Sequence, residues 1–212
     1  MALKIYEIFH SLQGETSRIG LPTVFVRLTG CPMRCTYCDT EYAFSGGSNI
    51  EIADILAKVA EFETKYVTVT GGEPLAQKEC YVLLQALCDG GYSVSLETGG
   101  AMDIAPVDAR VSIILDIKTP ASHEEKNNLW SNLSHIKPKD EIKFVLCNRA
   151  DYDWAKTKIA ELKLNEKCPV LFSPSYHDLK AEDLANWVLQ DKLPVRMQIQ
   201  LHKILWGEKQ GV

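Results

Sequence analysis

The run Gly30-Cys-Pro-Met-Arg-Cys-Thr-Tyr-Cys-Asp-Thr40 places three cysteines, Cys31, Cys35 and Cys38, in the spacing CxxxCxxC. Three thiolates are one fewer than a closed structural zinc site takes, and one fewer than an ordinary four-thiolate iron–sulfur cluster takes. On a 4Fe–4S cluster they would leave one iron open to a substrate or cofactor. A zinc site that borrows a fourth ligand, such as one of the five His residues, is the alternative.

The composition excludes several classes of protein. The 212 residues are 46% hydrophobic and 24% charged, with a net charge of −5, which is ordinary for one globular domain and gives no basic surface for nucleic acid. No apolar run reaches the roughly 20 residues of a membrane helix, and the first residues lack a secretory signal. Seven Cys, an odd number, indicate free thiols. We expect a cytoplasmic protein, with Cys80, Cys88, Cys147 and Cys168 buried in the core.

A second motif, Thr70-Gly-Gly-Glu-Pro74, ends a β-rich run. Alone it would indicate a turn, but two glycines let the backbone approach a ligand closely and Glu73 can meet an ammonium group. Together, CxxxCxxC with an aromatic residue (Tyr37) before the third Cys and the GGEP run resemble the radical S-adenosylmethionine (SAM) superfamily. The resemblance implies a 4Fe–4S cluster on Cys31, Cys35 and Cys38.

The remaining sequence alternates strand-like and helix-like segments. Six β-rich segments precede a last one at 196–201, and they lie at 23–29, 66–70, 92–97, 111–117, 142–147 and 169–172. Helical spacing marks 51–62, 78–89, 151–164 and 178–190, whereas 121–135 is polar and holds at most one short helix. This alternation predicts a parallel sheet with outer helices. The chain is short for an eight-stranded barrel of about 250 residues, so we expect an α/β fold, the trimmed partial (β/α)6 barrel of radical SAM enzymes.

The chain also resembles one family within that superfamily over nearly its whole length. The segments that carry this likeness are Ser11-Leu-Gln-Gly-Glu15, Arg27, Cys38-Asp-Thr40 and Gln200-Leu-His-Lys203. They resemble the 7-carboxy-7-deazaguanine synthases. The resemblance implies conversion of 6-carboxy-5,6,7,8-tetrahydropterin to 7-carboxy-7-deazaguanine with ring contraction and loss of ammonia, in queuosine and deazapurine biosynthesis, with SAM used catalytically. The alternative is a radical SAM activase that acts on a protein partner. However, the segment Ser11-Leu-Gln-Gly-Glu15 and the residue Arg27 both favour a small carboxylated ligand.

The same resemblance assigns residues to ligands. SAM would be held by Tyr37, Asp39, Gly72, Glu73, Asp116 and Lys118, although some relatives read Ser-Pro-Lys where this chain reads Asp116-Ile-Lys118. Mg²⁺ would bind Thr40, because this ion prefers hard oxygen ligands. The substrate would contact Leu12, Gln13, Gly14, Glu15, Arg27, Thr70 and His202.

The role of Arg27 is also supported by the alternation of side chains along its strand. Strand side chains alternate, so Val26 and Leu28 would pack against helices and leave Arg27 facing the barrel interior. There its guanidinium matches a carboxylate bidentately, and without substrate it would pair with a carboxylate such as Glu15 or be hydrated.

The resemblance also implies an organisation and partners. We expect one radical SAM domain over residues 1–212, with a core at about 20–202, a substrate-binding segment at 1–19 and an extension at 203–212. The partners would be a flavodoxin or ferredoxin type reductant and a second copy in a homodimer. Whether the extension covers the substrate is left open.

Overall fold

The predicted parallel strands form the centre of the sheet. The computed structural model describes residues 1–212 and contains a nine-stranded sheet in the order β3-β1-β2-β4-β5-β6-β7-β8-β9. From β2 to β9 every neighbouring pair is parallel. These strands are β2 (Pro22–Leu28), β4 (Tyr66–Gly71), β5 (Ser93–Thr98), β6 (Ser112–Asp116), β7 (Glu141–Leu146), β8 (Val170–Pro174) and β9 (Arg196–Met197). The two ends of the sheet, β3 and β9, do not pair, so the barrel stays open, as the partial (β/α)6 prediction requires.

Two antiparallel strands, β1 (Ala2–Leu12) and β3 (Ser48–Glu51), extend the sheet beyond β2. Neither strand is predicted by the sequence pattern. In β1 the reason is a register shift between Ile5 and Glu7, which breaks the alternation of apolar and polar residues that reveals a strand. The predicted N-terminal segment 1–19 is therefore largely a strand of the main sheet.

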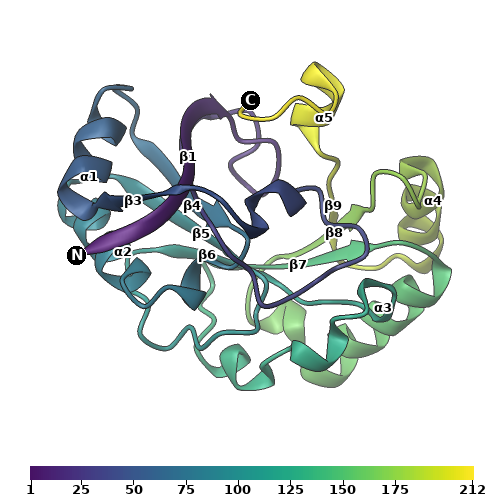
Figure 1. The fold of residues 1–212 in the computed structure, drawn as a ribbon. Coiled ribbons are helices and arrows are strands. Elements are labelled where there is room, and N and C mark those ends of the chain that lie inside the picture. Colours follow the sequence, from purple (N-terminus) through teal and green to yellow (C-terminus); the bar gives the residue numbers. More distant parts are fainter.

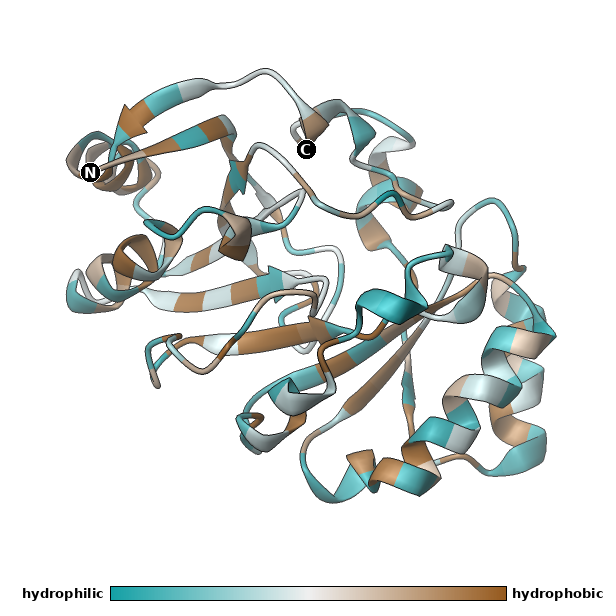
Figure 2. Cartoon of the chain, turned by 60° about the horizontal axis from the view of Figure 1, so that its bottom comes forward, coloured by the Kyte–Doolittle hydropathy of each residue, from teal (hydrophilic) through white to brown (hydrophobic).

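Four helices connect the parallel strands and lie along the outside of the sheet (Figure 1). They are α1 (Ile52–Ala60), α2 (Cys80–Asp89), α3 (Arg149–Leu162) and α4 (Ala181–Asp191), each close to its predicted range. Figure 2 shows hydrophobic colour along the strands, and bands of hydrophobic and hydrophilic colour alternate along the helices. Cys80, Cys88, Cys147 and Cys168 are buried free thiols, as predicted. None of the helices is long and apolar enough to cross a bilayer.

Two predictions on local structure were wrong. The polar segment 121–135 contains three short 3-10 helices, η3 (Pro120–Ser122), η4 (Glu125–Asn127) and η5 (Trp130–Ser134), in place of one short helix. The last strand ends at Met197 and is followed by α5 (Leu201–Trp206). The chain leaves the sheet at Gln198, whose side-chain amide accepts from the Thr16 N–H at 2.7 Å and donates to the Ser173 hydroxyl at 2.9 Å. These bonds tie the end of the chain to the loop after β1.

Candidate active site

A cavity of about 440 Å³ lies where the carboxyl ends of the parallel strands meet. This is the end at which barrel folds place their reactive groups. Sixteen of the seventeen predicted site residues line it: Leu12, Gln13, Gly14, Glu15, Arg27, Cys31, Cys35, Tyr37, Cys38, Asp39, Thr40, Thr70, Gly72, Asp116, Lys118 and His202. The structure therefore brings the residues predicted for the cluster, SAM, Mg²⁺ and the substrate into one space.

Glu73 is the predicted residue that does not line the cavity. Its side chain is completely buried, and its carboxylate accepts hydrogen bonds from the Thr98 hydroxyl at 2.9 Å and the Gly99 N–H at 2.8 Å. Burial raises the pKa of this carboxyl. In this structure Glu73 fixes the turn after β5 behind the cavity wall.

The cysteine loop follows β2 and is clamped from two sides. On one side, the Glu73 N–H donates to the Gly30 carbonyl at 2.8 Å. On the other, the Thr36 hydroxyl donates to the Ala121 carbonyl at 2.7 Å, and Glu124 accepts from the Arg34 N–H at 2.6 Å. The loop between β6 and β7 therefore supports the loop that carries the thiols.

The two glycines of the GGEP run allow this close approach. A side chain at Gly72 would place its Cβ 2.3 Å from the Gly30 carbonyl oxygen and 2.7 Å from the Cys31 Cβ. At Gly71, where φ is +152°, a Cβ would lie 2.3 Å from the Leu28 carbonyl oxygen. The two glycines thus let the end of β4 contact the cysteine loop. This close packing is a second physical reason for the two glycines of the motif, in addition to the close approach of a ligand.

The three thiols of Cys31, Cys35 and Cys38 are free and half-buried. Burial raises the pKa of each thiol, and neighbouring thiols raise it further. They do not converge on one point as the ligands of a single ion would. A 4Fe–4S cube takes three thiolates on three different irons, so separated soft donors on one cavity wall fit it.

Asp116, Lys118 and Tyr37 form a polar group beside the thiols. Lys118 Nζ lies 3.0 Å from Asp116 Oδ2 and 5.7 Å from the centre of the Tyr37 ring. Burial acts to lower the pKa of Lys118, but Asp116, Tyr37 and Cys35 together outweigh burial, so that the pKa is raised and the amine stays charged. The Tyr37 hydroxyl and Asp116 Oδ1 are buried without a hydrogen-bond partner. Buried polar atoms that have no hydrogen-bond partner in the chain are normally paired with a ligand or with water.

The opposite part of the cavity is organised by Glu15. Its carboxylate is paired with Lys143 Nζ at 2.8 Å and accepts from the Gln200 amide at 3.0 Å. Burial acts to raise the pKa of Glu15, but Lys143 outweighs burial and the pKa is lowered. Gln200 also donates to Asp39 at 2.9 Å. Glu15 is therefore a fixed, ionised acceptor.

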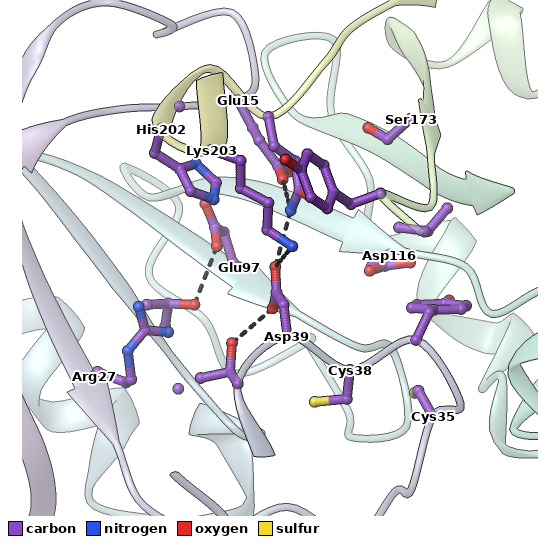
Figure 3. A pocket seen from close by; sticks show the side chains of 18 of the residues that line it. Glu15, Arg27, Cys35, Cys38, Asp39, Glu97, Asp116, Ser173, His202 and Lys203 are labelled. Atoms are coloured by element: carbon purple, nitrogen blue, oxygen red, sulfur yellow. Dashed lines mark hydrogen bonds and ion pairs between the residues drawn. The ribbon is translucent and has the colours of Figure 1, made fainter. Parts of the chain in front are cut away.

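Gln13, Thr70 and Glu97 form a second buried group. The Gln13 amide donates to Glu97 Oε1 at 3.2 Å, and the Thr70 hydroxyl donates to Glu97 Oε2 at 3.1 Å. Burial raises the pKa of Glu97. In the view of Figure 3, Arg27 lies to the left of Asp39 and Asp116 to its right, and Glu15 and His202 lie above.

His202 and Thr40 complete the predicted set. A Cβ at Gly14 would lie 2.1 Å from His202 Nδ1, so only glycine leaves room for this ring. Burial lowers the pKa of His202. The Thr40 hydroxyl donates to Asp39 Oδ1 at 2.8 Å, and the Thr40, Lys203 and Gln200 contacts outweigh burial to hold the pKa of Asp39 at about 2.

Arg27 is paired with a carboxylate, as predicted, but the carboxylate is Glu7 and not the suggested Glu15. Arg27 Nε donates to Glu7 at 2.8 Å, whereas Glu15 is engaged by Lys143. Glu7 belongs to β1, and pairing across a strand that was not predicted could not be read from the sequence. The predicted orientation of Arg27 was right, since Val26 and Leu28 are in the core and Arg27 lines the cavity.

Several lining residues were missed. They include Glu97, Lys143, Ser173, Gln200 and Lys203. Lys143 carried a signal, because a lysine between Ile142 and Phe144 interrupts an apolar strand. The tail, for which a cover over the substrate was left open, lines the cavity from Gly207 to Val212.

Comparisons with known proteins agree with this geometry. Residues 25–120 match the family model described as the radical SAM superfamily. A 7-carboxy-7-deazaguanine synthase of Chlorobaculum tepidum is 46% identical over 97% of this chain and 94% of that protein. Another of Koribacter versatilis is 41% identical over 99% of this chain and its whole length. The crystal structure of QueE from Escherichia coli superposes with a TM-score of 0.78 at 22% identity, covering 95% of each chain, which shows the shared fold.

Proposed function

The chain belongs to the 7-carboxy-7-deazaguanine synthase family of radical SAM enzymes, and on that premise we propose how its residues divide the work. The substrate is 6-carboxy-5,6,7,8-tetrahydropterin, which undergoes ring contraction and loses ammonia. When bound, the 4Fe–4S cluster and SAM supply the radical chemistry that starts the rearrangement. The chain positions these groups and excludes water. The single observation that carries the proposal is one cavity lined by three half-buried thiols and by a fixed set of polar groups.

Cys31, Cys35 and Cys38 hold the cluster on the wall next to Tyr37, Asp116 and Lys118. The buried Asp116 Oδ1 and the Tyr37 hydroxyl have no partner in the chain, which supports their use by SAM. Asp39 and Gly72 line the same wall. Glu73 contributes from behind, because it holds the Gly99 N–H and the Thr98 hydroxyl.

The substrate lies toward Leu12–Glu15, Thr70 and His202. Arg27 binds its carboxylate through the guanidinium fork. Glu15 is kept ionised by Lys143 and accepts hydrogen bonds from N–H groups of the pterin ring. Gln13 and the backbone of Leu12 and Gly14 read the amide edge of the ring.

Mg²⁺ completes the proposed site, with Thr40 as its protein ligand. The Thr40 hydroxyl faces the cavity next to Asp39, and a hydroxyl together with substrate oxygens suits this hard ion. Family membership further supports a flavodoxin or ferredoxin type reductant, a homodimer and a cytoplasmic location. Residues 1–212 act as one domain in this proposal.

The decisive experiment is anaerobic incubation of the reconstituted protein with 6-carboxy-5,6,7,8-tetrahydropterin, SAM, Mg²⁺ and a reductant. Mass analysis should find 7-carboxy-7-deazaguanine, with SAM recovered in excess of any deoxyadenosine. SAM consumption without the deazaguanine product would contradict the proposal.

Thr40 permits a separate test of the magnesium proposal. Thr40→Ala should weaken the dependence of turnover on Mg²⁺ more than it weakens SAM binding, because it removes the proposed hard oxygen ligand but only one of the contacts of Asp39. Thr157→Ala is the control, since Thr157 is exposed on α3, does not line the cavity, and has a hydroxyl that donates to the Asp153 carbonyl. If the Mg²⁺ titration of Thr40→Ala coincides with that of the unaltered protein, Thr40 is only a turn residue.

A further inference from the structure

Glu7 lies opposite Arg27 on the neighbouring strand, and this pairing depends on a bulge in β1. The strands β1 and β2 are antiparallel, and Ile5 pairs with Leu28. A regular ladder continued from that pair would place Tyr6 opposite Arg27. The register shifts between Ile5 and Glu7, so Glu7 takes that position. One extra residue in a strand is a β-bulge, and it re-aims the side chains that follow.

The bulge also exchanges the two faces of β1. Before it, Ile5 is buried in the core; after it, Ile8 is the residue that packs against the core. Because strand side chains alternate, Glu7 and Phe9 are left on the face of the cavity. Phe9 lines the cavity together with Arg27. Without the bulge, the alternation would direct both Glu7 and Phe9 toward the apolar core.

Arg27 is held on several sides before any ligand arrives. Glu7 Oε1 accepts from Arg27 Nε at 2.8 Å and from the Tyr42 hydroxyl at 3.2 Å. The rings of Phe9 and Tyr42 lie 5.6 Å and 5.7 Å from the guanidinium carbon. The side chains of Arg27 and Glu7 are only 14% and 21% exposed. Burial raises the pKa of Tyr42 to about 12, so its hydroxyl is a permanent donor to Glu7.

We propose that Glu7 is a positioning residue that orients Arg27 for the carboxylate of the substrate, an inference that rests on the proposed function. Glu7 engages Nε, which leaves the two terminal nitrogens of Arg27 as one forked edge directed to the ligand. A carboxylate matches that edge with two parallel hydrogen bonds. Fixing a long side chain in advance lowers the ordering cost that binding would otherwise meet.

The test compares two pterins on the anaerobically reconstituted protein. One is 6-carboxy-5,6,7,8-tetrahydropterin and the other is tetrahydropterin without the carboxylate. Glu7→Ala should weaken the first by about tenfold or more, as for a misdirected charged hydrogen bond, and leave the second within about twofold. Glu7→Gln, whose amide oxygen still accepts from Nε, should recover part of the loss. With Arg27→Lys already present, Glu7→Ala should cause little further loss, because the two residues act together.

Glu51→Gln is the control, because it removes an exposed ion pair with the N-terminal amine (2.7 Å) on the neighbouring strand β3 and should change neither affinity. Iron content and thermal unfolding report whether each variant is folded and loaded. Equal losses for both pterins in Glu7→Ala, or undiminished binding of the carboxylated one, overturn the role of Glu7. If the unaltered protein binds both pterins equally, the carboxylate role of Arg27 fails and the role of Glu7 fails with it, whereas the proposed function fails only if the product assay finds no 7-carboxy-7-deazaguanine.

Discussion

Cys31, Cys35 and Cys38 differ from the other four cysteines in their surroundings. They are half-buried on the cavity wall, whereas Cys80 and Cys168 are buried among apolar side chains. A thiolate ligand needs both access to the metal and loss of its proton. Their position on the cavity wall gives these thiols access to a metal, and the positive charge of bound iron would favour loss of the thiol proton.

Replacing any of the three with Ala should abolish the cluster. Cys31→Ala, Cys35→Ala and Cys38→Ala each leave two thiolates, which cannot hold a cube with one open iron. Iron and sulfide analysis after anaerobic reconstitution measures this directly. The matched variants Cys80→Ala and Cys168→Ala should retain full cluster content and lose only packing stability of about 1–3 kcal/mol. A complete cluster in any of the first three variants would show that the ligands were misidentified.

At the scale of single residues, the sequence was sufficient to predict which side chains of a local motif lie together. The thiols, Thr40 and Asp39 lie within ten positions of one another, so their shared loop follows from the chain itself. A carboxylate partner for Arg27 was predicted, but its identity as Glu7 was not, because that depends on the register of two strands. A bulge of one residue decides that register, and no local pattern reveals it.

Among the elements, the contact between the end of β4 and the cysteine loop is the tightest backbone approach at the site. It depends on Gly71 and Gly72, because either Cβ would overlap backbone atoms of β2 or of the loop. The overlapping atoms are backbone, so a side chain there cannot be accommodated by a simple rotamer change. The cluster loop and the GGEP turn are therefore one structural unit.

Gly72→Ala should displace the cysteine loop. Its Cβ would lie 2.3 Å from the Gly30 carbonyl oxygen, so we expect poor cluster retention and a loss of stability of about 1–3 kcal/mol from overpacking. Gly90→Ala is the control: Gly90 has a φ of −71° and its nearest neighbour would be 3.3 Å from the new Cβ. Iron content and chemical denaturation of both variants are the measurements. Normal iron content in Gly72→Ala would contradict the proposed clamp.

The order and type of the parallel strands could be predicted because each is a short apolar run between turn residues. The edge elements could not. Strand β3 has only four residues, none of them buried, and helix α5 has no buried residue. Elements at the rim are held by tertiary contacts, so their sequences show no periodic spacing of buried apolar residues.

Across the whole molecule, a chain of alternating charges joins the two halves of the cavity. Glu15 pairs with Lys143 at 2.8 Å, Lys143 lies 3.9 Å from Asp116, and Asp116 pairs with Lys118 at 3.0 Å. Lys143 is the link between the loop after β1 and the end of β6. A buried pair of this kind is costly to break, because one charge is left alone.

Lys143→Met should therefore destabilise the protein by about 3–5 kcal/mol at neutral pH. The pH dependence should also change sign. In the unaltered protein the pKa of Glu15 is lowered from 4.5, so its contribution to stability is present above that value and is lost as the pH falls through the lowered pKa. Without Lys143, burial raises the pKa of Glu15 and acidification should restore stability. Denaturant titrations between pH 7 and pH 4 measure this, and a constant difference between the two proteins would refute the pairing.

The bonds from the end of the chain to the loop after β1 bear on the order in which the protein is made. Gln198 reaches Thr16, 182 positions earlier, and Gln200 reaches Glu15. A chain emerging from the ribosome folds from its N-terminal part, and the strands from β4 to β9 pair in the order of their synthesis. The rim of the cavity must wait for Gln198 and Gln200. During translation, the thiol loop therefore faces an unfinished and accessible enclosure until these two residues have left the ribosome.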